Sequence, residues 1–202
     1  MATGTDAGAE VITITAEPLT AENFAVFGDV LAAAGEPLPH VYGDTMDVYQ
    51  PSTHECDVET EFIVTRYRLR EPRVLFLERH KQITQTFIPL NGHPFVLAVA
   101  PPDAPLENGL PVLDSVRAFV VPGDAAARAH RGTWHEVPLP LVENSLTLLT
   151  SHHGVTSGWA ELDDGAEIHK GDTDEEKLNV TDRSGTVLMV DVPDEYQRGG
   201  AR

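Results

Sequence analysis

Residues 84–100 read TQTFIPLNGHPFVLAVA, which is two short apolar runs on either side of Asn91-Gly92. Asn-Gly is the dipeptide that tight hairpin turns favour, so we predict a β-hairpin here. Similar runs, rich in β-branched and aromatic residues, occur at 11–15, 61–69, 73–80, 116–122, 145–151 and 186–193. The sequence has no long helical periods, and many short strands at this spacing are typical of a sandwich or barrel.

One short helix is predicted near the N-terminus. Thr20 is a suitable N-cap, Glu22 lies in the first turn where the helix dipole favours an acid, and Gly28 ends the helix. The fold class is therefore all-β, an antiparallel β-barrel or jelly roll with a short N-terminal helix. At 22.0 kDa the chain has room for one core. We expect a single domain over 11–193 between disordered tails at 1–10 and 194–202.

The charge of the chain excludes several classes of partner. Fourteen Lys and Arg stand against 32 Asp and Glu, for a net charge of −18, which repels nucleic acid and anionic membranes. No apolar run approaches the about 20 residues that a membrane helix needs. The first ten residues lack the pattern of a secretory signal, so a cytoplasmic protein is expected. Cys56 is the single cysteine, which excludes a disulfide within one chain.

A strongly acidic segment lies near the C-terminus. Residues 161–177, ELDDGAEIHKGDTDEEK, contain eight carboxylates, but their offsets do not match a calcium-binding loop. We predict a solvated loop.

Polar residues gather around position 80. In a strand, alternate side chains share a face, so Glu78 and His80 point the same way. A tight connection after His80 would return Gln85 on a partner strand. The spacing of Glu78, His80, Gln85 and Gly92 resembles the first motif of the cupin superfamily. That superfamily's second motif adds a His after a Pro/Gly turn, and His130, which follows 122–123, suits this role.

Two longer blocks carry a closer resemblance. RHKQITQTFIPLNGHPFVLAVA (79–100) and VRAFVVPGDAAARAHRGTWHEVPL (116–139), with LTAENFAVFGDVL (19–31), are similar to the ureidoglycolate lyase family. These cupin-fold enzymes release urea from ureidoglycolate and leave glyoxylate. The resemblance runs from about Ile14 to about Thr150. It implies a cupin-like barrel, a lyase acting on a small α-hydroxy acid amide, and a homodimer.

The chemistry of ureidoglycolate indicates which residue types the site needs. The hydroxyl and ureido groups share one carbon, so cleavage requires a base for the hydroxyl proton and an acid for the leaving nitrogen. An imidazole titrates near neutrality, and burial can tune a carboxylic acid. The candidate catalytic residues are Glu78, His80 and His130.

Three further residues are candidates for binding a small carboxylate substrate. The Gln85 amide can donate and accept hydrogen bonds, the Arg131 guanidinium can hold a carboxylate in two places, and Trp134 can form a wall of the pocket. A divalent metal (Ni, Mn, Fe or Zn) is an open possibility, with His80, Gln85 and His130 as its ligands. The remaining histidines are expected to be structural: His40, His54, His93, His135, His152, His153 and His169.

Three positions depart from the family pattern. Asp47 stands where the family commonly has Arg, Ala129 where it has Tyr, and Glu136 where it has the second residue of a His pair. A lost cation and phenol change how a carboxylate is held. Two alternatives therefore stay open: a metal-dependent cupin oxygenase or isomerase acting on another small acid, and a small-molecule-binding cupin without turnover.

Overall fold

The computed structural model describes residues 8–38, 45–160, 166–169 and 174–197. The strands are β1 (Glu10–Pro18), β2 (Gly28–Leu31), β3 (Thr60–Tyr67), β4 (Arg73–Val74), β5 (Phe76–His80), β6 (Gln85–Pro89), β7 (Phe95–Ala100), β8 (Leu106–Glu107), β9 (Leu110–Pro111), β10 (Arg117–Val121), β11 (Ala126–Ala129), β12 (Trp134–His135), β13 (Leu139–Pro140), β14 (Ser145–His152), β15 (Glu175–Asn179) and β16 (Thr186–Asp191). The helices are α1 (Ala21–Phe24), α2 (Val155–Ala160), α3 (Val180–Ser184) and α4 (Asp194–Gln197), with a 3-10 turn at Leu113–Ser115.

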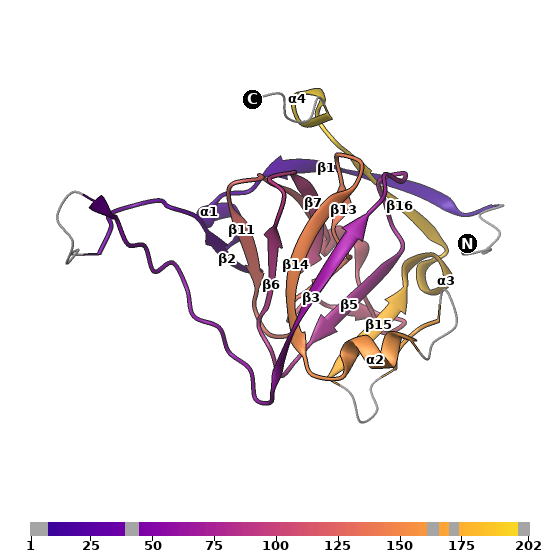
Figure 1. Cartoon of the computed structure of the whole chain (residues 1–202). Coiled ribbons are helices and arrows are strands. Elements are labelled where there is room, and N and C mark those ends of the chain that lie inside the picture. Colours follow the sequence, from indigo (N-terminus) through magenta and orange to yellow (C-terminus); the bar gives the residue numbers. More distant parts are fainter. Residues whose placement is uncertain (1–7, 39–44, 161–165, 170–173, 198–202) are drawn as a thin grey trace.

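Two facing sheets form the body of the molecule (Figure 1). Within the described residues, a nine-stranded sheet has the order β15-β5-β12-β7-β10-β1-β16-β4, with β13 beside β7. A five-stranded sheet has the order β2-β11-β6-β14-β3. The all-β prediction with a short N-terminal helix is confirmed. Helix α1 begins after a capping box, in which the Thr20 hydroxyl accepts from the backbone N–H of Asn23.

One strand departs from the antiparallel expectation. Strand β1 runs parallel to both of its neighbours, β10 and β16. The other pairings between described strands are antiparallel. The N-terminal strand thereby joins the C-terminal strand to the middle of the large sheet.

The predicted hairpin around Asn91-Gly92 is wrong, because β6 and β7 lie in different sheets. The dipeptide instead forms a corner between the sheets, with Gly92 at a φ of 71°. The Asn91 side chain ties this corner to β14 by accepting from the backbone N–H of Leu146. Gly123 packs so close that a Cβ there would lie 1.8 Å from the Gly92 carbonyl oxygen. Asn-Gly favours a tight turn both between paired strands of one sheet and, as here, between strands of two sheets.

Two hydrophobic cores explain why the run at 95–100 is apolar at every position. An inter-sheet core packs residues of β7 and β10 against Phe87 of β6 and Leu149 of β14. A second core, which includes Val96, Ala98 and Trp134, contains residues of the large sheet and the segments that cover it. Strand β7 is buried on both faces between them, and burial of both faces requires a continuous apolar run.

The structure corrects the predicted tails and acidic loop. Glu10 already belongs to β1, and residues 194–197 form α4 instead of a disordered tail. Residues 1–7 and 198–202 lie outside the described residues. In the acidic segment, Asp174 and Glu175 are buried beside β5, so the solvated-loop prediction is wrong there. Residues 161–165 and 170–173 lie outside the described residues.

No helix in the described parts of the chain has the length and hydropathy needed to cross a membrane.

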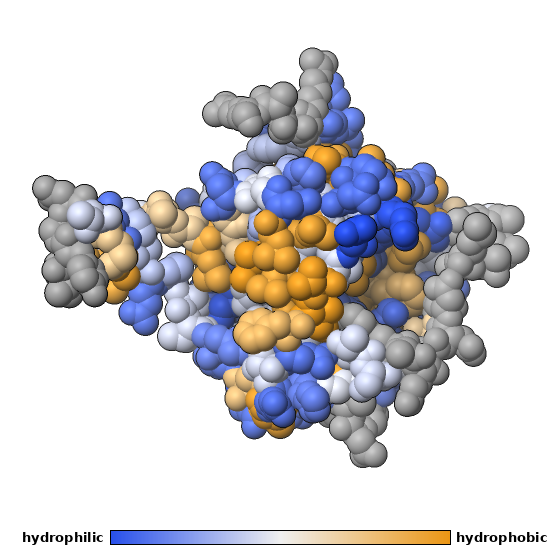
Figure 2. Space-filling model, viewed as in Figure 1, coloured by the Kyte–Doolittle hydropathy of each residue, from blue (hydrophilic) through white to orange (hydrophobic). Residues whose placement is uncertain are grey.

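The outer face of the five-stranded sheet carries an exposed apolar patch (Figure 2). In the sheet register Val64 lies opposite Leu148, which in turn lies opposite Ile88. Phe62 is 71% exposed and Val64 is 61% exposed, on the edge strand β3. The apolar outer patch, defined here as Phe62, Val64, Ile88 and Leu148, is thus continuous across three strands.

Candidate active site

Strands β5 and β12 place one acid and two imidazoles in the interior of the barrel. Glu78 and His80 alternate along β5, and His135 lies directly opposite Glu78 in the register. The His135 ring meets the Phe87 ring of the inter-sheet core edge-on, at 5.1 Å between centroids. Glu78, His80 and His135 are 4%, 2% and 1% exposed. We call these three residues the interior centre.

The geometry of the interior centre is compact. One nitrogen or oxygen atom from each residue lies within 4.8 Å of the others. The two imidazole rings stack at 5.7 Å between centroids, and His135 Nδ1 lies 3.5 Å from Glu78 Oε1. None of the four imidazole nitrogens has a hydrogen-bond partner among the described residues. Buried polar atoms are normally satisfied, so these nitrogens are suited to bind a substrate or a cation.

Burial sets the protonation states in the interior centre. It lowers the pKa of His80 to about 4, with a further contribution from His152 that Asp174 opposes. It also lowers the pKa of His135 to about 3, assisted by His80. Both imidazoles are therefore neutral at pH 7 and have a lone pair for a proton or a metal.

Glu78 is the proton-holding member of the interior centre. Burial raises its pKa well above the ordinary value, and the nearby carboxylates of Glu175 and Glu136 raise it further. Lys177 opposes this shift. A raised pKa favours the protonated form of this acid, which suits a general acid.

A cavity of about 210 Å³ reaches the interior centre. Its lining includes Glu78 and His135, together with two cationic residues, Arg70 and Lys177. Glu136 also lines it and accepts from the backbone N–H groups of Leu75 and Phe76. The cavity thus brings an acid, a neutral imidazole and positive charge together in one small space whose walls are mostly apolar.

The donor set of the interior centre fits a divalent metal. Two imidazoles and one carboxylate form the set found in mononuclear iron and zinc enzymes, and each ligand here has a free lone pair or an ionisable oxygen. The acidic surroundings of Glu78 also favour a cation, because a 2+ charge would relieve the repulsion among the carboxylates. Of the predicted ligands, His80 belongs to this set, whereas His130 and Gln85 are not in it.

His130 does not pair with His80 as the sequence predicted. The second imidazole beside His80 is His135, while His130 Nε2 lies 3.7 Å from Asp29. His130 and Arg131 line a separate cavity of about 450 Å³. The physical reason is that β11 ends at Ala129, so residue 130 begins the turn before β12 instead of lying on an inward face of a strand.

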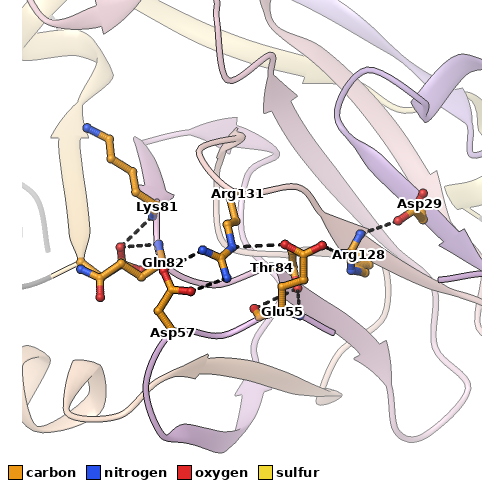
Figure 3. Close-up of polar contacts among 9 residues, drawn as sticks. Asp29, Glu55, Asp57, Lys81, Gln82, Thr84, Arg128 and Arg131 are labelled. Carbon is orange, nitrogen blue, oxygen red and sulfur yellow. Dashed lines mark hydrogen bonds and ion pairs between the residues drawn. The ribbon is translucent and has the colours of Figure 1, made fainter. Parts of the chain in front are cut away.

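Arg131 is engaged in an ion-pair ladder, defined as Asp29, Arg128, Glu55, Arg131 and Asp57 (Figure 3). Arg131 donates two hydrogen bonds to Asp57, at 2.7 and 2.9 Å. Arg128 donates to Asp29 at 2.5 Å. The ladder ties the segment before β3 to β11 and the turn that follows it. Three carboxylates alternate with two guanidiniums, so each guanidinium lies between two acids, which favours a structural role.

The two remaining predicted residues lie on opposite sides of the large sheet. Gln85 shares its face of β6 with Phe87, so it faces the inter-sheet interior, and its Oε1 has no hydrogen-bond partner in the described chain. Trp134 is fully buried in the second core beneath the Arg79 guanidinium, 4.1 Å from the ring centroid. Adjacent residues of a strand face opposite ways, so Trp134 points away from the face that carries His135.

His135, which was expected to be structural, is a member of the interior centre, and the sequence contains a signal for it. Once Trp134 is assigned to an apolar face, strand alternation places the next residue on the polar face.

Among the positions that depart from the family pattern, Ala129 is buried in the inter-sheet core and Asp47 is exposed in the segment between β2 and β3. Glu136 is buried, and Arg70 lies 3.5 Å from its carboxylate.

A family model and curated relatives of this chain agree on one family. The family model described as "Ureidoglycolate lyase" matches residues 11–157. A curated ureidoglycolate lyase of Pseudomonas fluorescens (strain Pf0-1) is 36% identical over 148 residues, covering 70% of this chain and 86% of that protein. Those of Pseudomonas fluorescens (strain SBW25) and Stutzerimonas stutzeri (strain A1501) are 39% and 37% identical over 149 and 148 residues, covering 70% of this chain and 86% and 84% of those proteins.

Among solved structures, RmlC from Streptococcus suis aligns with 69% of this chain and 63% of its own, at a TM-score of 0.31 and 8% identity, a likeness that says nothing about function. The family match ends at residue 157, so β15, with Asp174 before it, lies beyond the matched region. The match nevertheless covers more than half of the chain and includes both strands of the interior centre. The chain belongs to the ureidoglycolate lyase family.

Proposed function

We propose that the protein is a lyase that cleaves ureidoglycolate, or a closely related small α-hydroxy acid amide, to glyoxylate and urea. The observation that carries the proposal is the interior centre, in which an acid of raised pKa and two neutral imidazoles are buried together in a member of this family. General acid–base cleavage of the carbon–nitrogen bond needs these two kinds of group.

A neutral imidazole of the interior centre acts as the base. It takes the proton of the substrate hydroxyl as the carbon–oxygen double bond of glyoxylate forms. The electron pair of the breaking carbon–nitrogen bond moves to the ureido nitrogen. His135 is the better placed of the two imidazoles for this role, because it lines the cavity with Glu78.

Glu78 acts as the acid in this scheme. Its raised pKa favours the protonated form, which can donate to the leaving ureido nitrogen. The reaction moves one proton from the substrate hydroxyl to the base and one from Glu78 to urea. The cycle closes when the proton held by the imidazole returns to Glu78, whose carboxyl lies 3.5 Å from His135.

Two cationic residues and several interior polar groups are suited to hold the substrate. Lys177 and Arg70 line the cavity and can bind the carboxylate. Thr147 and Ser151 alternate with Leu149 on β14, so their hydroxyls face the interior with no hydrogen-bond partner in the described chain. These hydroxyls can recognise the ureido group, as can Gln85. We assign the carboxylate to Lys177 or Arg70 instead of Arg131, because Arg131 lines the other cavity.

Glu78, His80 and His135 would hold a divalent metal if one is used. Bound there, such a cation supplies Lewis-acid polarisation of the substrate oxygens. Metal binding would deprotonate Glu78, and a different group would then have to protonate the leaving ureido nitrogen. The same donor set makes the metal-dependent oxygenase or isomerase the second candidate function.

Purified protein incubated with ureidoglycolate tests the proposal. Glyoxylate and urea should appear in equal amounts, in the presence of chelator or after addition of Ni, Mn, Fe or Zn. No release above the uncatalysed rate under any of these conditions would exclude the lyase. Elemental analysis of protein purified without chelator separates the two candidates, because stoichiometric iron or manganese without lyase turnover favours the second.

We further infer that the protein pairs with a second copy through the apolar outer patch. The exposed side chains of Phe62 and Val64 share one face of β3, and β3 is an edge strand of the described sheet, where a second chain can dock. The net charge of −18 makes nucleic acid an unsuitable partner. The single free thiol of Cys56 suits a reducing compartment, so the cytoplasm remains the proposed location.

A further inference from the structure

The C-terminal strand β15 forms one wall of the interior centre, although it lies beyond the region that the family model matches. In the register Glu175 lies opposite His80, and Lys177 lies opposite Glu78. Directly opposed residues of an antiparallel pair share a face. This segment therefore adds charged groups to the same interior face that carries the acid and the first imidazole.

Asp174, immediately before β15, is the residue of this segment whose carboxylate lies beside the His80 imidazole. Its Oδ2 lies 3.8 Å from His80 Nδ1, and both side chains are buried, with exposures of 0% and 1%. This separation exceeds a hydrogen bond, yet neither atom has a hydrogen-bond partner among the described residues. Two buried, otherwise unsatisfied atoms of opposite polarity thus face each other.

The other oxygen of the Asp174 carboxylate is fixed. Oδ1 accepts hydrogen bonds from the backbone N–H groups of Lys81 and Gln82, at 2.8 and 2.7 Å. These are the two residues that follow His80. The carboxylate is therefore anchored to the turn that ends β5, and this anchoring directs Oδ2 toward the imidazole.

We propose that Asp174 is a positioning residue that holds His80 in the tautomer with its proton on Nδ1. The proton faces the carboxylate, and the lone pair is left on Nε2, where it can serve a substrate or a metal. Carboxylates that orient an imidazole in this way are a common second layer around enzymatic histidines. The inference rests on the proposed function, because it assumes that the interior centre is where the chemistry occurs.

Asp174→Asn is the informative substitution. The new amide oxygen can still accept from Lys81 and Gln82, so the anchoring of the turn is retained. The amide nitrogen, however, donates a hydrogen bond and favours an unprotonated Nδ1 on His80. Glu176→Gln is the matched control, because it also removes one negative charge from this segment, but Glu176 contacts Arg79 and Lys81 instead of His80.

Long-range proton–nitrogen NMR of the imidazoles reads the tautomer directly, with the His80 signals identified by their loss in His80→Gln. The wild type should show the proton on Nδ1. Asp174→Asn should move it to Nε2 and lower kcat about 10- to 100-fold with little change in KM. Glu176→Gln should keep the wild-type tautomer, with kcat within about twofold of wild type. Circular dichroism of each variant verifies folding.

The outcomes separate this inference from the proposed function. Nε2 protonation in the wild type, or an unchanged tautomer in Asp174→Asn, would overturn the role of Asp174 whether or not ureidoglycolate is cleaved. A tautomer switch with unaltered kcat would also overturn it. A switch in a protein that releases no glyoxylate would leave the Asp174–His80 relation standing and remove the lyase proposal.

Discussion

Trp134 and His135 are adjacent in the sequence, yet their side chains lie on opposite faces of the large sheet. Trp134 fills the second core under Arg79, and His135 stacks with His80 in the interior. Strand alternation accounts for the difference, because successive side chains of β12 point in opposite directions. A histidine that looks unremarkable in the sequence therefore becomes the second imidazole of the interior centre.

Substitutions of individual histidines distinguish the interior centre from the site that the sequence predicted. We expect His80→Gln and His135→Gln each to lower kcat/KM for ureidoglycolate by at least about 100-fold, the lower end of typical acid–base contributions. His130→Gln should retain most of the activity, because its side chain lies by Asp29 outside the interior centre.

Coupled glyoxylate assays on purified variants provide the measurement, and His153→Gln controls for loss of an exposed imidazole. A large loss in His130→Gln with little loss in His135→Gln would contradict this assignment of the site.

The buried imidazoles also predict how stability depends on pH. The folded-state pKa of His135, about 3, lies below the unfolded value of about 6.5, so the unfolded chain binds the extra proton between these limits. Stability from this residue is therefore complete above pH 6.5 and is lost as the pH falls. Between pH 6.5 and 5 the loss amounts to about 2 kcal/mol.

Urea unfolding of chelator-treated wild type and His135→Gln at both pH values tests this expectation. The stability of the wild type relative to the variant should fall by up to about 2 kcal/mol on going to pH 5. The opposite contributions of Glu78 and Glu136, whose pKa values are raised, are present in both proteins and largely cancel. An increase in the wild type's relative stability would show that His135 is protonated in the folded state.

At the level of elements, the edge strand β2 meets its neighbour β11 in the five-stranded sheet through a very close backbone approach. Gly28 begins β2 and packs against β11 so tightly that a Cβ would lie 1.9 Å from the Arg128 carbonyl oxygen. Because the obstructing atom belongs to the backbone, a side chain there must displace one strand from the other. The edge strand β2 depends on this glycine for its pairing with β11.

Gly28→Ala should lower the free energy of unfolding by about 3 kcal/mol, the upper range for overpacking. Gly158→Ala is the matched control, because Gly158 lies in α2 with open space where a Cβ would be added. Its stability should stay constant or rise by up to about 1 kcal/mol. Chemical denaturation of the two variants measures the difference, and equal stabilities would show that β2 can shift without cost.

The whole molecule combines a large negative charge with the apolar outer patch. Like charges keep copies apart at long range, whereas the patch on β3, β14 and β6 favours contact at short range. A two-fold contact of this patch with its copy would remove Phe62 and Val64 from water. The interior centre lies on the other side of the five-stranded sheet, so dimerisation leaves the cavity near Arg70 and Lys177 uncovered.

We expect the wild type to sediment as a dimer at micromolar concentration, and Phe62→Lys/Val64→Lys to sediment as a monomer with its fold intact. Each lysine would place a charge in the dimer contact, and like charges would face each other there. Val11→Lys controls for charge added to an exposed apolar position of another strand, where Val11 is 63% exposed. A monomeric wild type, or a dimeric double variant, would exclude this patch as the interface.

Much of the fold could be predicted from the sequence, because its determinants are local. The β-branched and aromatic runs became strands, Thr20 caps α1, and alternation placed Glu78 and His80 on one face of β5. Pairing could not be predicted in the same way. Asn91-Gly92 is compatible with a hairpin and with a corner between sheets, and the burial of both faces of β7 decides between them.

The sequence by itself determined the class of fold, the family, and two members of the interior centre, since each follows from patterns within a few neighbouring residues. Only the tertiary structure decided that His135 joins His80, that His130 lies by Asp29, and that Asp174 returns from the C-terminal segment to face His80. The physical reason is that these relations depend on which strands pair and how the chain turns between them. The pairing of the strands is decided by the burial of side chains over both sheets, so it cannot be derived from any short stretch of sequence.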